Sequence, residues 1–161
     1  EIGHGRQCNV RGASDAGYHG GKESFARETG ALEQPLDDLL RASDFVSLHL
    51  PLKPETHHLI GARELALMKP TAVLVNTARG GIVDPAALYE ALAERRIMGA
   101  ALDVTEPEPI PMESPLLTLD NCLIIPHIGS ATVETRGQMA LLAARNLLAG
   151  VRGEPLPHAV G

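Results

Sequence analysis

An α/β fold with a mainly parallel sheet is predicted by three features of this 161-residue sequence. Four apolar runs have the length of a strand, and Val and Leu dominate the second run, as is typical of strands buried on both faces. Segments with helical patterning lie between most of the runs, which is the alternation of βαβ units. A polar or charged side chain stands at or just after the end of each run, where such sheets bind ligands. The runs cover residues 44–50, 71–78, 98–104 and 121–127.

Three helices are expected before the second strand. Residues 22–30 have a helical pattern that ends at Gly30, a residue suited to a left-handed cap. Residues 35–43 begin with Pro35 and carry acidic side chains in the first turn, both of which favour a helix start. Residues 61–69 form a short helical pattern, and Pro70 stops it.

Two further helices follow. Asp84 is a candidate N-cap for a helix over 84–96, with Pro85 at the first helical position. A long closing helix is expected over 132–150, with Gly150 just past its end. Residues 51–58 read as a polar loop and residues 105–115 as a proline-rich loop.

Composition limits the classes of protein that fit. The hydrophobic content of 44% and charged content of 21% are those of an ordinary globular chain. The net charge of −6 argues against nucleic acid or an anionic membrane as a partner. No apolar run approaches the roughly 18 residues of a membrane-spanning helix, and no signal peptide is visible. The two cysteines fit neither a metal site nor a disulfide spacing, so we expect no metal and a reducing, cytoplasmic setting.

Three stretches carry chemistry: NTARGG at 76–81, LDVTEPEP at 102–109 and PHIGSAT at 126–132. They supply the cation Arg79, several carboxylates and the imidazole of His127. A histidine paired with a carboxylate transfers protons, and an arginine clamps a substrate carboxylate, a set that suits the reduction of a keto acid by a cofactor hydride. Taken singly, a histidine after a strand, such as His127, is more often a loop histidine than a catalyst, and Arg79 also fits a surface ion-pair partner, so these residues alone leave several reactions open.

Longer motifs narrow the choice. NTARGGIVDPAALYEAL, ALDVTEPEP and LLTLDNCLIIPHIGSAT resemble the D-isomer-specific 2-hydroxyacid dehydrogenases, and within that family most closely the glyoxylate/hydroxypyruvate reductases. SDFVSLHLPLKPETHHLI and LLAARNLLAGVRGEPLP also match the pattern, so the resemblance covers roughly residues 18–157. It implies an incomplete Rossmann-type, doubly wound parallel sheet that binds NAD(P) and serves the reduction of a short 2-keto acid.

The resemblance also implies residue roles at the substrate. Arg79 matches the arginine that holds the substrate carboxylate and carbonyl, and His127 matches the general acid/base. Glu108 matches the glutamate that orients this histidine and tunes its pKa. Glu106 competes for that role on chemical grounds, and the spacing from Asp103 selects Glu108.

Further roles concern the cofactor. Asp103 matches the residue that holds the nicotinamide carboxamide, and its charge suits the cationic oxidised ring. Thr77 and Pro51 match cofactor contacts, and Gly129 and Ser130 follow the histidine at the nicotinamide end.

Residues 18–22, Y-H-G-G-K, decide between NAD and NADP. No acid stands there to bind the ribose 2′-hydroxyl of NAD, and Lys22 and His19 can meet the 2′-phosphate of NADP. The sequence therefore favours NADP, with NAD as the alternative. Lys22 as a solvated surface charge is an equally good interpretation.

The start of the chain departs from the family pattern. Residues 3–8, G-H-G-R-Q-C, are one residue short of the G-x-G-x-x-G loop, with Cys8 in place of the third glycine. Residues 9–17 are too few for the usual crossover helix at about 1.5 Å per residue. We therefore interpret 1–17 as an irregular remnant of the glycine-loop region, 18–150 as the NAD(P)-binding domain and 151–161 as a C-terminal tail.

The substrate domain that the family carries toward its N-terminus has no counterpart here. We expect the parent protein to reduce glyoxylate or hydroxypyruvate as a homodimer, and this chain alone to be weakly active or inactive. The alternative is a non-catalytic, nucleotide-sensing interaction protein with a dehydrogenase-like fold. Retention of Arg79, Glu108 and His127 argues against that alternative.

Overall fold

The computed structural model describes residues 7–10 and 34–159. The chain forms two compact units, residues 1–126 and residues 127–161, a division that falls earlier than the expected domain end at 150. The expected helix over 22–30 lies outside the described residues. The elements are β1 (Gln7–Val10), α2 (Leu36–Ala42), β2 (Phe45–Leu48), η1 (Pro54–Thr56), α3 (Ala62–Leu67), β3 (Val73–Asn76), η2 (Gly80–Ile82), α4 (Pro85–Ala93), β4 (Gly99–Leu102), η3 (Pro115–Thr118), β5 (Cys122–Ile124) and α5 (Val133–Val151).

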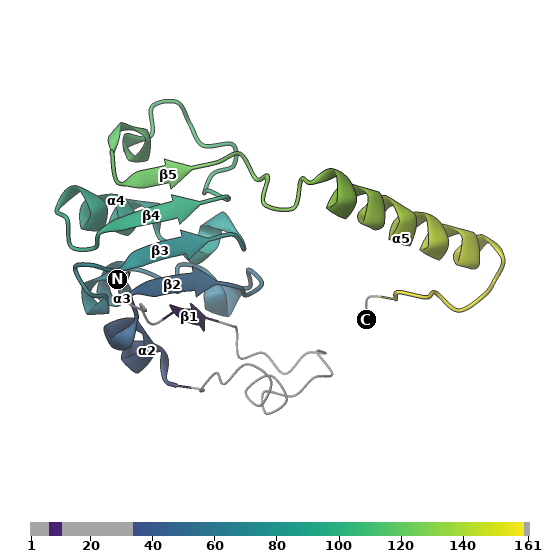
Figure 1. Ribbon diagram of the computed structural model, residues 1–161, viewed down its shortest axis with the longest axis horizontal. Coiled ribbons are helices and arrows are strands. Elements are labelled where there is room, and N and C mark those ends of the chain that lie inside the picture. Colours follow the sequence, from purple (N-terminus) through teal and green to yellow (C-terminus); the bar gives the residue numbers. More distant parts are fainter. Residues whose placement is uncertain (1–6, 11–33, 160–161) are drawn as a thin grey trace, which may run out of the picture. The chain divides into compact units, whose positions relative to one another are not determined.

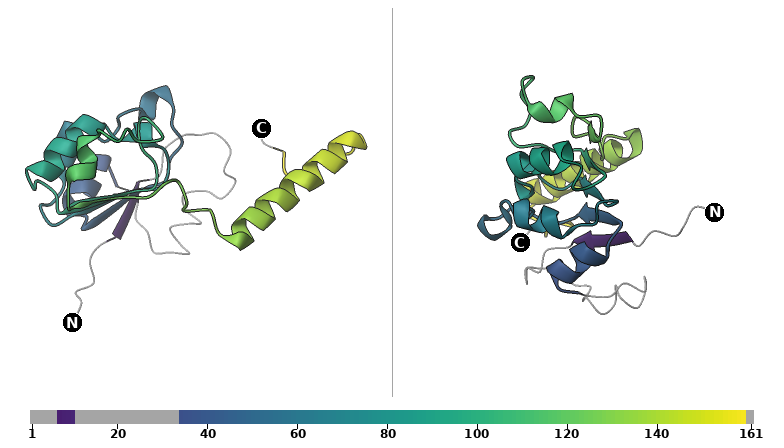
Figure 2. Two further views of the ribbon diagram at one scale, coloured as in Figure 1. Left: turned by 90° about the horizontal axis from the view of Figure 1, so that it is seen from above. Right: turned by 90° about the vertical axis from the view of Figure 1, so that its left-hand side faces the viewer.

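The first unit is built on a five-stranded parallel sheet in the order β1-β2-β3-β4-β5 (Figure 1). This confirms the predicted α/β fold. Because every connection steps the same way along the sheet, right-handed crossovers bring the intervening helices to one face. Figure 2 shows the helices of this unit on one side of the strands.

The core lies between that face and the helices. Alternate strand residues such as Val46 and Leu74 are fully buried and pack in one cluster with Leu40 of α2, Leu65 of α3 and Leu88 of α4. The other face of the sheet is more open, since Phe45 and Leu123 are exposed. In strands β2 to β5, whose side chains the structure describes, the exposed and partly exposed residues on that face are Phe45, Ser47, Val73, Val75, Ala101 and Leu123.

Helix starts follow the predicted chemistry. The Asp84 side chain accepts hydrogen bonds from the backbone N–H groups of Ala86 (2.9 Å) and Ala87 (3.2 Å), which caps α4. Helix α2 begins directly after Pro35, and α3 ends before Pro70. These caps are local, which explains why the sequence predicts them well.

Two predictions at the chain ends were wrong. The sequence predicts no regular element within 1–17, yet Gln7–Val10 form a strand that pairs in parallel with β2. Strand formation here depends on a partner distant in sequence, which local propensity does not register. Gly150 was expected past the end of the closing helix, but α5 continues to Val151, and Gly153 is the glycine with a left-handed φ of 69°.

Within the part of the chain that the structure describes, none of the helices is both long enough and apolar enough to cross a membrane.

Candidate active site

The carboxyl ends of the central strands are level with one another. The register aligns Leu48 of β2, Asn76 of β3 and Leu102 of β4. The next residues along these strands are His49, Thr77 and Asp103. The edge of the sheet on which the sequence predicts a ligand site thus carries three polar side chains in a row.

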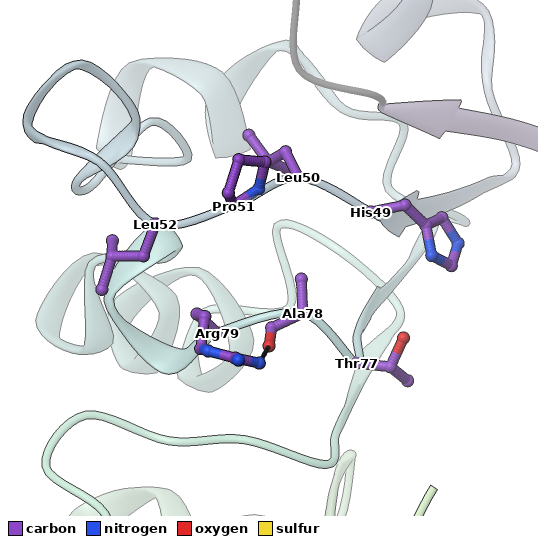
Figure 3. Close-up of a pocket in the computed structure, with 7 residues that line it drawn as sticks. All are labelled: His49, Leu50, Pro51, Leu52, Thr77, Ala78 and Arg79. Atoms are coloured by element: carbon purple, nitrogen blue, oxygen red, sulfur yellow. Dashed lines mark hydrogen bonds between the residues drawn. The ribbon is translucent and has the colours of Figure 1, made fainter. Parts of the chain in front are cut away.

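An open hollow of about 610 Å³ lies between the loops that follow β2 and β3 (Figure 3). One loop contributes mainly apolar residues, and the other contributes polar ones. Three residues predicted from the sequence, Pro51, Thr77 and Arg79, line this hollow together. The complete lining is His49, Leu50, Pro51, Leu52, Thr77, Ala78 and Arg79.

Asn76 shapes the loop that presents Arg79. Its side chain is 1% exposed; Nδ2 donates to the carbonyl of Arg79 at 2.9 Å and Oδ1 accepts from the N–H of Ala78 at 3.0 Å. The exposed guanidinium then donates from Nη1 to the carbonyl of Ala78 at 2.7 Å. Asn76 lies in the NTARGG motif, but its role in holding this loop was not predicted from the sequence. The available signal was a single amide at the end of an otherwise apolar strand.

The two glycines after Arg79 allow another segment to pass closely. A Cβ on Gly80 would lie 1.9 Å from the carbonyl oxygen of Thr105, and a Cβ on Gly81 would lie 2.9 Å from Glu106 Oε1. No side chain fits at Gly80 without moving backbone. The loop of Arg79 is therefore held against the segment that carries Glu106.

Glu106 has partners of its own. Its carboxylate lies 2.7 Å from Nε2 of His58 and 3.3 Å from Nε2 of His57. The hydrogen bond from His58, helped by that from His57, lowers the pKa of Glu106 against the opposing effect of desolvation. Glu106 therefore serves these two histidines. Glu108 lies exposed in the proline-rich loop of the same unit.

The remaining predicted residues lie in three places. Asp103 is 5% exposed at the end of β4, and its N–H donates to the carbonyl of Asn76 at 2.9 Å. His127, Gly129 and Ser130 open the second unit directly after Pro126, and His127 has a left-handed φ of 52°. Lys22 lies outside the described residues.

The residues that line the hollow, together with Asp103, fit one end of a dinucleotide. A hollow of this size is within the range of about 300–1,000 Å³ found for ligand sites. Leu50 and Pro51 supply an apolar wall for a ring, whereas the Thr77 hydroxyl and the buried Asp103 carboxylate, next to one another at the strand ends, suit a polar carboxamide. Residues 3–6, which belong to the expected glycine loop, lie outside the described part of the chain.

A parallel sheet with polar residues at its carboxyl edge defines a nucleotide-binding α/β domain. The model of the family "D-isomer specific 2-hydroxyacid dehydrogenase, NAD binding domain" matches residues 5–129. The chain belongs to this family.

Curated relatives agree with the family. The chain is 54% identical over 139 residues to a glyoxylate reductase of Korarchaeum cryptofilum, covering 86% of this chain and 42% of that protein. It is 56% identical over 119 residues to glyoxylate/hydroxypyruvate reductase B of Pectobacterium carotovorum, covering 74% and 37% respectively. The chain thus spans about two fifths of the length of these relatives.

Solved structures with bound nucleotides have the same fold. D-lactate dehydrogenase with NAD⁺ from Lactobacillus jensenii matches with a TM-score of 0.73 and 33% identity over 80% of this chain and 42% of that one. A D-isomer specific 2-hydroxyacid dehydrogenase from Xanthobacter autotrophicus Py2, in complex with NADPH and MES, matches with a TM-score of 0.68 and 40% identity over 78% and 51%.

Proposed function

We propose that this domain serves the NAD(P)H-dependent reduction of a short 2-keto acid, glyoxylate or hydroxypyruvate, to the D-2-hydroxy acid. The single observation that supports it best is Arg79, presented at the hollow by the loop that Asn76 holds. The similarity to curated glyoxylate and hydroxypyruvate reductases supports the choice of substrate class.

Arg79 binds the substrate. Its guanidinium is exposed and forms one hydrogen bond to the backbone, which leaves further N–H donors for a carboxylate. A two-pronged contact to the carboxylate fixes the keto acid in one orientation, with its carbonyl near the sheet edge. All short 2-keto acids share this handle, so Arg79 selects the class of substrate rather than one member.

His127 donates the proton to the carbonyl oxygen, and Glu108 orients the imidazole and stabilises its charged form. The bound nicotinamide supplies the hydride. We assign Glu108 rather than Glu106 to His127 because the carboxylate of Glu106 serves His57 and His58.

Asp103 and Thr77 hold the nicotinamide carboxamide, and Pro51 contacts the ring. Gly129 and Ser130 close around the same end of the cofactor. We propose NADPH as the preferred cofactor, on the basis of Lys22 and the lack of an acid at 18–22, with NADH as the alternative.

We further propose a homodimer in a reducing, cytoplasmic setting. Phe45 and Leu123 leave apolar surface on the sheet of the first unit, which favours self-association. Cys122 is a free thiol whose burial raises its pKa to about 11, so it stays in the unreactive protonated form at neutral pH. Light scattering during size-exclusion chromatography measures the association directly.

The test is NADPH and NADH oxidation by the purified protein with glyoxylate and with hydroxypyruvate. We expect weak or no turnover by this chain alone. We expect turnover by the protein that carries it together with a substrate domain, and His127→Ala lowers that turnover by about 100-fold or more, the range for a lost general acid. His158→Ala is the matched control, because His158 is exposed and its hydrogen bonds to Asn146 come from its backbone. Turnover that His127→Ala leaves unchanged contradicts the assignment. Nucleotide binding with no turnover on any 2-keto acid, even by the protein that carries the substrate domain, favours a nucleotide-sensing interaction protein instead.

A further inference from the structure

Two histidines and a glutamate far apart in the sequence meet on the surface of the first unit. Nε2 of His57 lies 3.3 Å from Oε1 of Glu106, and Nε2 of His58 lies 2.7 Å from Oε2. The two imidazole rings are stacked, with centroids 3.8 Å apart and 24° between their planes. The three ligand atoms all lie within 4.8 Å of one another. Both histidines therefore direct the same ring nitrogen toward one carboxylate.

The backbone fixes this arrangement from both sides. The N–H of His58 donates to the carbonyl of Gly81 at 2.8 Å, and the N–H of Ile60 donates to the carbonyl of Ile82 at 3.0 Å. Glu106 in turn lies against Gly81, where a Cβ would come within 2.9 Å of its Oε1. The ligand-bearing loops are thus both anchored to the 80–82 turn, so the cluster is preorganised rather than assembled by chance contact of long side chains.

The cluster is also accessible from solvent. The side chains of His57, His58 and Glu106 are 48%, 36% and 37% exposed. An ion can therefore reach all three ligands directly. Exposure of this degree also leaves room for a water or a small anion as a further ligand.

We propose that His57, His58 and Glu106 form a binding site for a first-row divalent metal ion of the zinc type. Two imidazoles with one carboxylate are a known zinc ligand set, with metal–ligand bonds of about 2.0–2.2 Å. Such bonds place tetrahedral ligands roughly 3.3 Å apart, which matches the distance from His57 to Glu106. The distance from His58 to Glu106 must lengthen by about 0.6 Å, and the two stacked rings must turn so that both Nε2 lone pairs point at the ion; the three side chains are exposed enough to allow both changes. Deprotonated nitrogen and oxygen ligands then replace the present hydrogen bonds.

The bound ion joins two loops that are far apart in the sequence: His58 and Glu106 are 48 residues apart. It links the 53–60 loop to the 105–115 loop. Both loops lie against the turn at 80–82, which directly follows Arg79 in the sequence. The role of the ion is therefore to brace the turn that presents Arg79, and it takes no part in hydride transfer. This role is independent of the proposed reductase activity, since it requires neither nucleotide nor keto acid.

The test is calorimetric titration of the nucleotide-free protein with zinc chloride, with Co²⁺ absorption spectra as a second probe. We expect one zinc per chain and the visible absorption of tetrahedral cobalt. Glu106→Gln and, separately, His57→Gln each weaken zinc binding by at least about tenfold, as expected for a lost ligand. His158→Gln, which removes an exposed histidine from the second unit, leaves the affinity unchanged.

Any one of four outcomes overturns the proposal. One is the absence of stoichiometric zinc binding by the unmodified protein. A second is zinc affinity that neither Glu106→Gln nor His57→Gln changes, and a third is zinc affinity that His158→Gln lowers as much as they do. His57 is largely exposed, so its replacement keeps the protein folded and the test interpretable even if Glu106→Gln is unstable. Cobalt spectra with intense thiolate bands, the fourth outcome, would assign the ion to a cysteine and also contradict the site.

Discussion

Asn76 shows how one side chain links the sheet to the substrate loop. It is a buried amide at the carboxyl end of β3, and both its donor and its acceptor are used by the backbone of residues 78 and 79. Between the end of β3 and the start of η2 at Gly80, this amide holds the backbone of residues 78 and 79 and so sets the position of Arg79.

We predict that Asn76→Ala lowers the free energy of unfolding by about 2 kcal/mol, because a buried amide is lost: the N–H of Ala78 loses its acceptor, and the carbonyl of Arg79 keeps only the N–H of Ile82 at 3.3 Å. Urea denaturation followed by circular dichroism measures the change. Asn146→Ala is the matched control: Asn146 also donates to one carbonyl and accepts from one N–H, both of His158, but at a solvent-accessible position. There water replaces the lost bonds, so the cost stays below about 1 kcal/mol. Equal costs at the two sites would contradict the role assigned to burial.

Glu106 makes stability depend on acid pH. The hydrogen bonds from His58 and His57 hold its pKa below the ordinary glutamate value. A lowered pKa in the folded state stabilises the protein above the unfolded pKa, about 4.3, and this stabilisation is lost as the pH falls through the folded pKa.

We therefore predict that Glu106→Gln is less stable than the unmodified protein at neutral pH, and that the difference shrinks below about pH 4.3. Urea denaturation over a series of pH values measures it. Glu113→Gln, which removes an exposed glutamate of the same loop, is the matched control. A difference for Glu106→Gln that stays constant down to acid pH would show that its contacts do not depend on charge.

The position of a residue can be predicted from the sequence where it depends on local order. Pro51, Thr77 and Arg79 each follow a strand by one to three positions, so their place at the sheet edge follows from the strands. The role of Asn76 could not be predicted from the sequence, because it depends on which backbone groups of the following loop turn toward its amide. The cluster of His57, His58 and Glu106 required the contact of two loops that are 48 residues apart in sequence, which no local pattern contains.

At the scale of elements, the glycine pair after Arg79 is a packing requirement. The 105–106 backbone passes so close to Gly80 that a Cβ there would overlap the carbonyl of Thr105. Gly137, in contrast, lies in α5 with no atom within 4 Å of the place its Cβ would take.

Substitution by alanine is expected to change the free energy of unfolding in opposite directions at Gly80 and at Gly137. Gly80→Ala destabilises the protein by at least about 2 kcal/mol, because backbone must move. Gly137→Ala stabilises its helix by about 0.5–1 kcal/mol, the usual gain in a helix interior. Thermal and urea denaturation monitored by circular dichroism measure both. If Gly80→Ala were as harmless as Gly137→Ala, the close passage of the two loops would be refuted.

Element boundaries were predictable where a cap or a proline sets them. Asp84 starts α4 and Pro35 precedes α2, and both act through bonds or angles within a few residues. β1 was missed because its stability comes from pairing with β2. The end of α5 was misplaced because a glycine ends a helix only where the chain needs a left-handed residue, and this falls at Gly153 rather than Gly150.

At the scale of the whole molecule, the order of the strands produces the site. Since β2, β3 and β4 are adjacent, parallel and in level register, consecutive stretches of sequence deliver His49, Thr77 and Asp103 to one edge. The sequence predicts this edge because the alternation of strands and helices fixes the direction of the strands. The residues from 127 onward form a separate compact unit, which this alternation does not predict.

The most direct test of the account is calorimetric titration of the protein with NADPH and NADH. We predict that it binds at least one of them, and that Asp103→Asn weakens binding by about tenfold, equal to about 1.4 kcal/mol. Asp120→Asn is the matched control, because Asp120 lies before β5 at the opposite edge of the sheet and pairs with Arg95 at 2.6 Å; it leaves the affinity unchanged. Binding of neither nucleotide, or equal effects of the two substitutions, would contradict the claim that the carboxyl edge is the nicotinamide site.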